Sequence, residues 1–135
     1  MKKYNVIVVF SKDLNKTLMC KRTKEPYKGM FNLVGGKIEK ENDSLNEAYR
    51  ELREETNINN DDISLVHFMN IEYITIGKSI EVYYGILNKD VLLIEEVNKL
   101  KWTDINDNFF DMNKYAGEGN IGHIIEEIKI ELNSK

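Results

Sequence analysis

The hydrophobic and polar positions of the chain follow two periods, one typical of strands and one typical of helices. Apolar, aromatic and β-branched residues gather in short stretches that polar or glycine-containing turns separate. These stretches predict strands at residues 4–10, 17–21, 31–34, 63–76, 80–87 and 100–103. The first two form a strand pair, and the pair flanking Gly77-Lys78 forms a long hairpin. Residues 23–30 contain Pro26 and Gly29, which indicates an exposed loop.

Two segments have helical spacing. Ser44 followed by Glu47 is the sequence signature of a capping box, and Asn57 stands where a left-handed residue ends a helix, so a helix is predicted over 44–56. Near the C-terminus, apolar side chains recur at the spacing of one helix face: Ile121, Ile124, Ile125, Ile128 and Leu132. The order strands, helix, strands, helix predicts a mixed α/β (α+β) sandwich, with a mixed sheet between helices.

Composition narrows the class of protein. The 135 residues are 41% hydrophobic, which suits a single domain spanning residues 1–135. A net charge of -4 argues against a binder of nucleic acid polymers, which needs a basic surface. Cys20 is the only cysteine, which fits a reducing compartment and excludes a disulfide within the chain. The apolar run at Val6–Phe10 is too short for a membrane span or a signal-peptide core, so we expect a cytoplasmic protein without membrane contact. The oligomeric state is not indicated.

The stretch EAYRELREETNI, residues 47–58, carries the most distinctive charge pattern. Glu47, Glu51, Glu54 and Glu55 fall in a sector of about 100° on the predicted helix. A solvated surface face is one interpretation. However, like charges at these spacings repel, and a divalent cation would offset the repulsion because Mg²⁺ prefers carboxylate oxygens. Gly35-Gly36 shortly before the helix lets backbone approach a ligand closely, which favours a metal-bound phosphate.

Residues 36–58 resemble the Nudix box of the MutT-like pyrophosphohydrolases. The resemblance departs from the family pattern at Asn57, which replaces a glycine, and at Asn42, which replaces a glutamate that usually pairs with the arginine of the box. Seven of its nine specified positions are present: Gly36, Arg50, Glu51, Leu52, Glu54, Glu55 and Ile58.

The resemblance implies a Nudix-type α/β/α sandwich and the hydrolysis of a nucleoside diphosphate linked to another moiety. It implies Mg²⁺ as cofactor, with Mn²⁺ as a substitute. The general base would be Glu54 or Glu55, and Arg50 would orient the glutamates electrostatically. The implied metal ligands are a backbone carbonyl near Gly36 and the carboxylates of Glu51, Glu54, Glu55 and Glu96, with Glu95 as the rival of Glu96 and surface charge as the alternative for both.

The resemblance also implies a nucleotide site. Arg22 and Lys37 would bind phosphate oxygens, although Arg22 could also be a solvated charge at a strand end. Asn32, beside Gly35, and Asn120 would read a base, although Asn120 could also be a helix N-cap.

These asparagines favour a purine nucleoside triphosphate such as 8-oxo-dGTP as substrate. The alternatives are an ADP-ribose or dinucleoside polyphosphate pyrophosphatase, a non-catalytic nucleotide-binding module, and an acidic domain that docks a basic partner.

Overall fold

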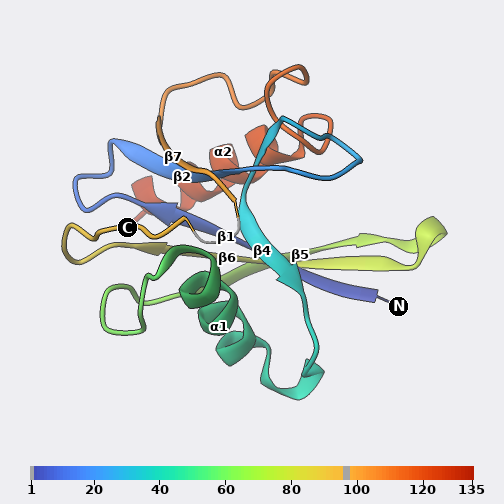
Figure 1. The fold of residues 1–135 in the computed structure, drawn as a ribbon, viewed down its shortest axis with the longest axis horizontal. Coiled ribbons are helices and arrows are strands. Elements are labelled where there is room, and N and C mark those ends of the chain that lie inside the picture. Colours follow the sequence, from blue (N-terminus) through green and yellow to red (C-terminus); the bar gives the residue numbers. More distant parts are fainter. Residues whose placement is uncertain (1, 96–97) are drawn as a thin grey trace.

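The computed structural model describes residues 2–95 and 98–135, with the side chain of Glu41 also left out, and shows a seven-stranded mixed sheet between two helices (Figure 1). The predicted fold class is confirmed. The strands are β1 (Lys2–Phe10), β2 (Lys16–Lys21), β3 (Phe31–Asn32), β4 (Val34–Lys37), β5 (Val66–Tyr73), β6 (Lys78–Ile86) and β7 (Leu100–Asp104). The helices are α1 (Ser44–Thr56) and α2 (Asn120–Asn133), with short 3-10 turns at Glu41–Asp43 and Ile74–Ile76.

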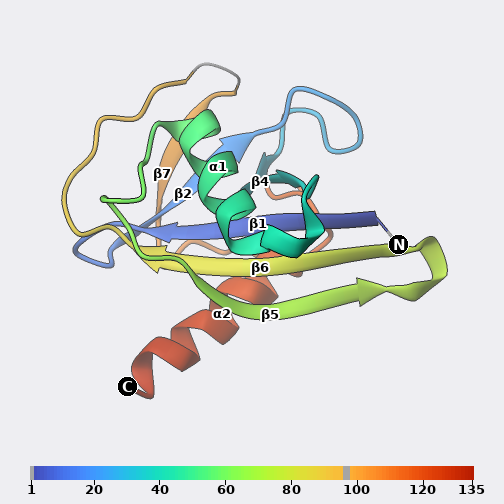
Figure 2. The same cartoon turned by 90° about the horizontal axis from the view of Figure 1, so that it is seen from below.

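The centre of the sheet is the parallel pair of β1 and β6. Helix α1 covers one face and α2 covers the other (Figure 2). Ile7 and Val9 pack in the cluster beneath α1, while Val8 and Phe10 pack in the cluster beneath α2. Because both faces of this strand are buried, its sequence is a continuous apolar run without alternation.

One edge of β1 is shared between two strands, and this division shapes the site. β2 pairs with β1 at Phe10 and Thr17, whereas β4 pairs with β1 along its first half, from Tyr4 opposite Lys37 to Ile7 opposite Val34. β3 extends β2. Only Leu33 separates β3 from β4. The chain therefore changes at this residue from pairing with β2 to pairing with β1.

The structure corrects one strand prediction. The strand predicted at residues 31–34 is interrupted at Leu33, and Gly35 and Gly36, which the prediction left out, lie within β4, where they pair with Val6 and Asn5 of β1. Leu45, in the first turn of α1, is exposed. Within the described chain, no helix has the length and apolar character needed to cross a membrane.

Candidate active site

Gly35 and Gly36 of β4 each lie in close contact with a different neighbouring residue. A Cβ atom on Gly35 would lie 2.1 Å from the carbonyl oxygen of Asn5, so only glycine fits that position. A Cβ atom on Gly36 would lie 2.9 Å from the carboxylate of Glu51. The absence of a side chain at Gly36 thus leaves room for this carboxylate beside the backbone of β4.

The three glutamates predicted as metal ligands differ in environment. Glu51 is largely buried, and Glu55 accepts the N–H of Gly35 at 3.4 Å. Burial, together with the charges of its neighbours Glu51 and Glu54, raises the pKa of Glu55 to about 7, and burial also raises the pKa of Glu51. Glu54 is more than half exposed and its carboxylate pairs with Arg50 at 2.9 Å.

Arg50 connects these carboxylates to the start of the helix. Its Nε donates to Glu47 at 2.7 Å, and its Nη2 lies 3.3 Å from Glu51. Glu47 is buried, and its other oxygen accepts the N–H of Lys40 at 3.0 Å. The capping-box prediction is therefore wrong. The N-cap is Asp43, without a side-chain cap bond, and Glu47 serves Arg50 instead.

Asn5 of β1 is a polar neighbour that the sequence did not indicate. Its Oδ1 accepts the N–H of Gly36 at 3.0 Å, which fixes the side chain against β4. Its Nδ2 is buried and has no hydrogen-bond partner among the described residues. An unsatisfied buried donor is uncommon, and neither N–H of this amide group is paired within the described residues.

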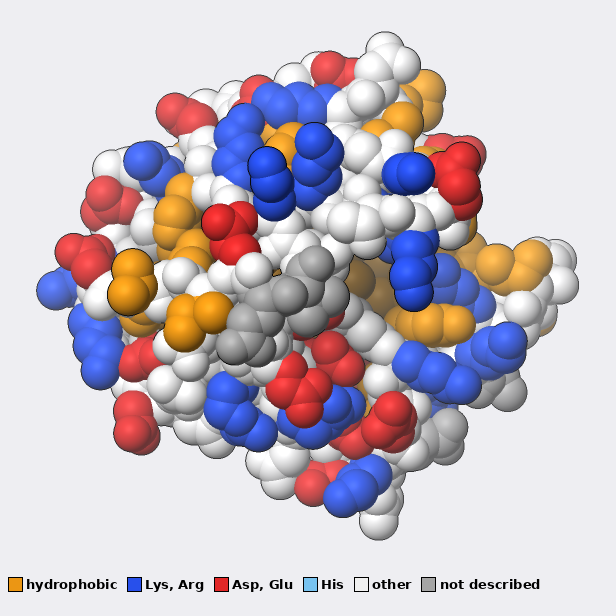
Figure 3. All heavy atoms as spheres, in the orientation of Figure 1, with side chains coloured by type: hydrophobic (Ala, Val, Ile, Leu, Met, Phe, Trp, Pro, Cys, Tyr) orange, Lys and Arg blue, Asp and Glu red, His pale blue; other side chains and the backbone are white. Residues whose placement is uncertain are grey.

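Two cavities meet where the chain crosses from β3 to β4. The larger, of about 550 Å³, extends over β1, β5, β6 and the start of α2, and the smaller, of about 240 Å³, extends to Glu55. In Figure 3 acidic side chains gather over α1 on one side of a hollow, and basic side chains lie on the other side. The residues common to both cavities are Arg22, Asn32, Leu33 and Gly35.

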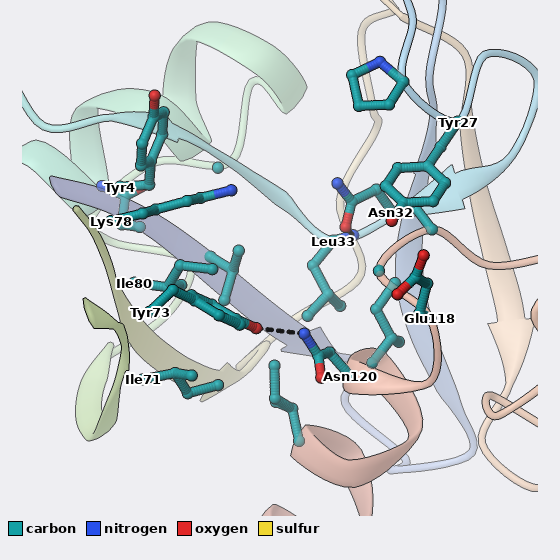
Figure 4. Close-up of a pocket in the computed structure, with 18 of the residues that line it drawn as sticks. Tyr4, Tyr27, Asn32, Leu33, Ile71, Tyr73, Lys78, Ile80, Glu118 and Asn120 are labelled. Atoms are coloured by element: carbon teal, nitrogen blue, oxygen red, sulfur yellow. Dashed lines mark hydrogen bonds between the residues drawn. The ribbon is translucent and has the colours of Figure 1, made fainter. Parts of the chain in front are cut away.

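The predicted substrate residues converge on this junction with one exception. Arg22, Asn32 and Gly35 line both cavities, and Asn120 lines the larger one. Asn120 is not the N-cap of α2, because that position belongs to Gly119. Its amide instead donates to the hydroxyl of Tyr73 (Figure 4). Lys37 is exposed at the end of β4 and lines neither cavity.

Further side chains of the larger cavity come from positions for which the sequence predicted no role in the site. Figure 4 shows Tyr27 and Glu118 on the same side of the cavity as Asn32. Lys78 and Tyr73 come from the opposite side, at the β5–β6 hairpin. No local spacing could have identified them, since they come from three separate parts of the chain and only the tertiary fold brings them together.

The donor set beside Gly36 has the chemistry of a hard cation site, because carboxylate and backbone oxygens are what Mg²⁺ prefers. Burial and then the charges of Glu51 and Glu54 raise the pKa of Glu55, and a bound cation would relieve the repulsion between these carboxylates. As placed, with Glu54 turned to Arg50, no three acidic, histidine or cysteine side chains of the described residues gather as a ligand group. Glu96 lies outside the described residues, and Glu95 accepts the N–H of Leu100.

The chain thus combines a sheet between two helices with an arginine-linked glutamate cluster whose Glu55 lines the smaller cavity. The NUDIX domain model matches residues 1–121, so the chain belongs to the Nudix family, and the predicted class of Nudix pyrophosphohydrolase is confirmed. Comparison with curated proteins finds no match.

Solved structures share the fold at low sequence identity. An Ap4A hydrolase from C. elegans superposes with a TM-score of 0.74 at 21% identity, with 100% of both chains covered. The dihydroneopterin triphosphate pyrophosphohydrolase of E. coli gives a TM-score of 0.74 at 16% identity, covering 96% of this chain and 95% of that one. The NUDIX domain of Shewanella oneidensis NrtR, complexed with ADP ribose, gives 0.69 at 20% identity, covering 96% and 87%.

Proposed function

We propose that the protein hydrolyses a purine nucleoside triphosphate, with 8-oxo-dGTP as one candidate, to the monophosphate and pyrophosphate. The observation that carries this proposal is the junction of the two cavities. The larger has the volume and the mixed apolar and amide lining of a nucleotide site. The smaller leads from Arg22 to Glu55. A substrate with its base in the first cavity would direct its phosphates into the second.

Arg22 and Glu55 line the second cavity, and they would act together with the neighbouring residues of α1 and β4. Arg22 would bind phosphate oxygens, and Glu51, Glu54 and Glu55 with a carbonyl near Gly36 would hold Mg²⁺, with Mn²⁺ as a substitute. The bound metal would neutralise the anhydride oxygens and help to orient a water molecule.

The reaction adds one water across the anhydride. The water oxygen attacks the α- or the β-phosphorus, the bond from that phosphorus to the α,β-bridging oxygen breaks, and the leaving pyrophosphate or nucleoside monophosphate keeps the electron pair of that bond. The proton released by the water passes to a carboxylate oxygen of Glu54 or Glu55. Glu54 is exposed and paired with Arg50, while Glu55 is buried with a raised pKa.

Other substrates of the same bond type form the second candidate. The similar folds include an Ap4A hydrolase and a domain complexed with ADP ribose, so ADP-ribose and dinucleoside polyphosphates belong in any substrate test. A non-catalytic nucleotide-binding module is the third candidate. Against it stands the cluster of Glu51, Glu54 and Glu55, in which burial and then the neighbouring charges raise the pKa of Glu55 without a structural benefit.

The experiment is a panel of purine triphosphates, ADP-ribose and Ap4A, assayed with Mg²⁺, with Mn²⁺ and with EDTA. We expect metal-dependent release of pyrophosphate, fastest from a purine triphosphate. Faster cleavage of ADP-ribose or Ap4A would overturn the substrate assignment. Nucleotide binding without cleavage of any compound would establish the non-catalytic module instead.

A further inference from the structure

Glu118 occupies an unusual position in the larger cavity. It lies in a turn in which three consecutive residues have left-handed backbone, with φ of 85° at Gly117, 55° at Glu118 and 94° at Gly119. This conformation is uncommon for a glutamate. The turn immediately precedes α2, and it directs the Glu118 side chain towards the wall that carries Asn32 and Tyr27 (Figure 4).

The carboxylate of Glu118 has no partner within the described part of the chain, where neither a hydrogen bond nor an ion pair engages it. Capping of α2 does not explain its position. The hydrogen bonds at the start of the helix run from Asn120 N–H to the Gly117 carbonyl and from His123 N–H to the Gly119 carbonyl. The helix does not use the carboxylate, which leaves it to a ligand or to solvent.

Electrostatics decide which part of a nucleotide can lie near Glu118. A phosphate group would be repelled by the carboxylate and attracted by the cations of the cavity. These cations are Arg22, at the junction with the second cavity, and Lys78, on the wall opposite Glu118. The group that lies beside Glu118 must therefore not be anionic and must offer N–H or O–H donors, because an ionised carboxylate only accepts hydrogen bonds.

We propose that Glu118 recognises a heterocycle edge that presents a ring N–H and an amino group side by side, the 2-amino-4-oxopyrimidine edge shared by guanine and pterins. This inference rests on the proposed function and specifies its substrate class. The two oxygens of a carboxylate match two parallel N–H donors, the arrangement that makes bidentate pairs strong. Tyr27 offers an aromatic ring beside that edge, and Asn120, held by Tyr73, offers a further amide.

The same geometry discriminates against other purines. Hypoxanthine lacks the amino group and keeps one donor, so one carboxylate oxygen loses its partner. Adenine presents a ring nitrogen with a lone pair next to its amino group, and this lone pair repels the carboxylate. A bidentate base contact discriminates by about tenfold or more against a base that lacks it.

The test measures binding by calorimetry with the α,β-methylene analogues of GTP and ITP in the presence of Mg²⁺. We expect the wild type to bind the GTP analogue about tenfold or more tightly than the ITP analogue. Glu118→Ala should bring the two affinities together by weakening the GTP analogue alone. Glu126→Ala removes an exposed glutamate of α2 outside both cavities and should retain the full preference.

Equal affinities in the wild type would overturn the proposal, as would a Glu118→Ala variant that weakens both analogues equally. Competition between the GTP analogue and dihydroneopterin triphosphate then identifies which source of the shared edge fits better. The proposed hydrolysis fails separately: a GTP-over-ITP binding preference without cleavage of GTP would remove the hydrolysis and keep the role of Glu118. Cleavage of GTP without the GTP-over-ITP binding preference would keep the hydrolysis and remove the role of Glu118.

Discussion

Glu47 lies one helical turn before Arg50, and its buried carboxylate accepts the arginine Nε at 2.7 Å. Its second oxygen accepts the N–H of Lys40 at 3.0 Å, so a single side chain links Arg50 to the loop before α1. The Nudix resemblance places a glutamate for this purpose at position 42, where this chain has an exposed asparagine. Glu47 therefore provides, from within the helix, the carboxylate that position 42 lacks.

Glu47→Gln should lower kcat by about tenfold or more, because the ion pair with Arg50 becomes a weaker hydrogen bond to an uncharged amide and Arg50 is free to turn further towards Glu51 and Glu54. Steady-state kinetics at several Mg²⁺ concentrations will measure the effect, with Glu126→Gln as the matched control on the exposed face of α2.

Asn42→Glu alone should change turnover only a few-fold, since Arg50 already has its partner. A rise of orders of magnitude in Asn42→Glu would show that Glu47 is not an adequate substitute.

Glu54→Gln and Glu55→Gln should each lower kcat by about 10² or more, the usual loss when a positioned acid-base group is removed. Glu54 is exposed, and Glu55 has a raised pKa, so neither charge is needed for folding. Thermal unfolding should therefore show stability equal to or above that of the wild type. Full activity in both single variants would exclude α1 from the mechanism.

Gly35→Ala and Gly36→Ala should separate stability from activity. The added methyl at position 35 meets the backbone of Asn5 at 2.1 Å, and β1 cannot move without disrupting the sheet, so we expect a loss of about 2 kcal/mol or more in the free energy of unfolding. At position 36 the methyl meets only the flexible end of Glu51 at 2.9 Å. That variant should fold nearly as stably while its Mg²⁺-dependent activity falls. Denaturant unfolding and Mg²⁺ titration together measure the two effects, and equal destabilisation of both variants would contradict this contrast.

Cys20 should react slowly with thiol reagents at neutral pH. Burial, reinforced by the negative charge of Glu55, raises the pKa of its thiol to about 11. The thiolate is the reactive form, so at pH 8 labelling by 5,5′-dithiobis(2-nitrobenzoate) should be about 10² slower than for free cysteine, and it should accelerate as the pH rises towards 11. A rate at pH 8 equal to that of free cysteine would show that Cys20 is neither buried nor close to the charge of Glu55.

Much of the fold follows from local sequence signals. Short stretches of sequence predicted three features that the structure confirms: the buried strand β1, the hairpin around Gly77 and the left-handed Asn57. Gly35 and Gly36 were misplaced because glycine disfavours strands in general, whereas here tight packing against β1 requires it. Such a requirement depends on a partner strand about 30 residues away in the sequence and has no local signal.

The residues of the candidate site likewise fall into those with a local sequence signal and those without one. The box residues Arg50, Glu51, Glu54 and Glu55 could be found from their spacing, and the structure places them on one helix. Glu47 was misassigned because its distance from Ser44 matches a capping box equally well. The 3-10 turn at Glu41–Asp43 precedes the helix, and the Glu47 carboxylate instead takes the N–H of Lys40. The cavity residues Tyr73, Lys78 and Glu118 needed the tertiary structure.

The most direct measurement is product analysis after incubation of the purified protein with GTP and Mg²⁺, with an EDTA control and the Glu55→Gln variant alongside. The proposed mechanism predicts GMP and pyrophosphate in equal amounts, formed only with the metal and reduced about 10² or more in the variant. GDP and phosphate as products, or turnover that EDTA leaves unchanged, would contradict it.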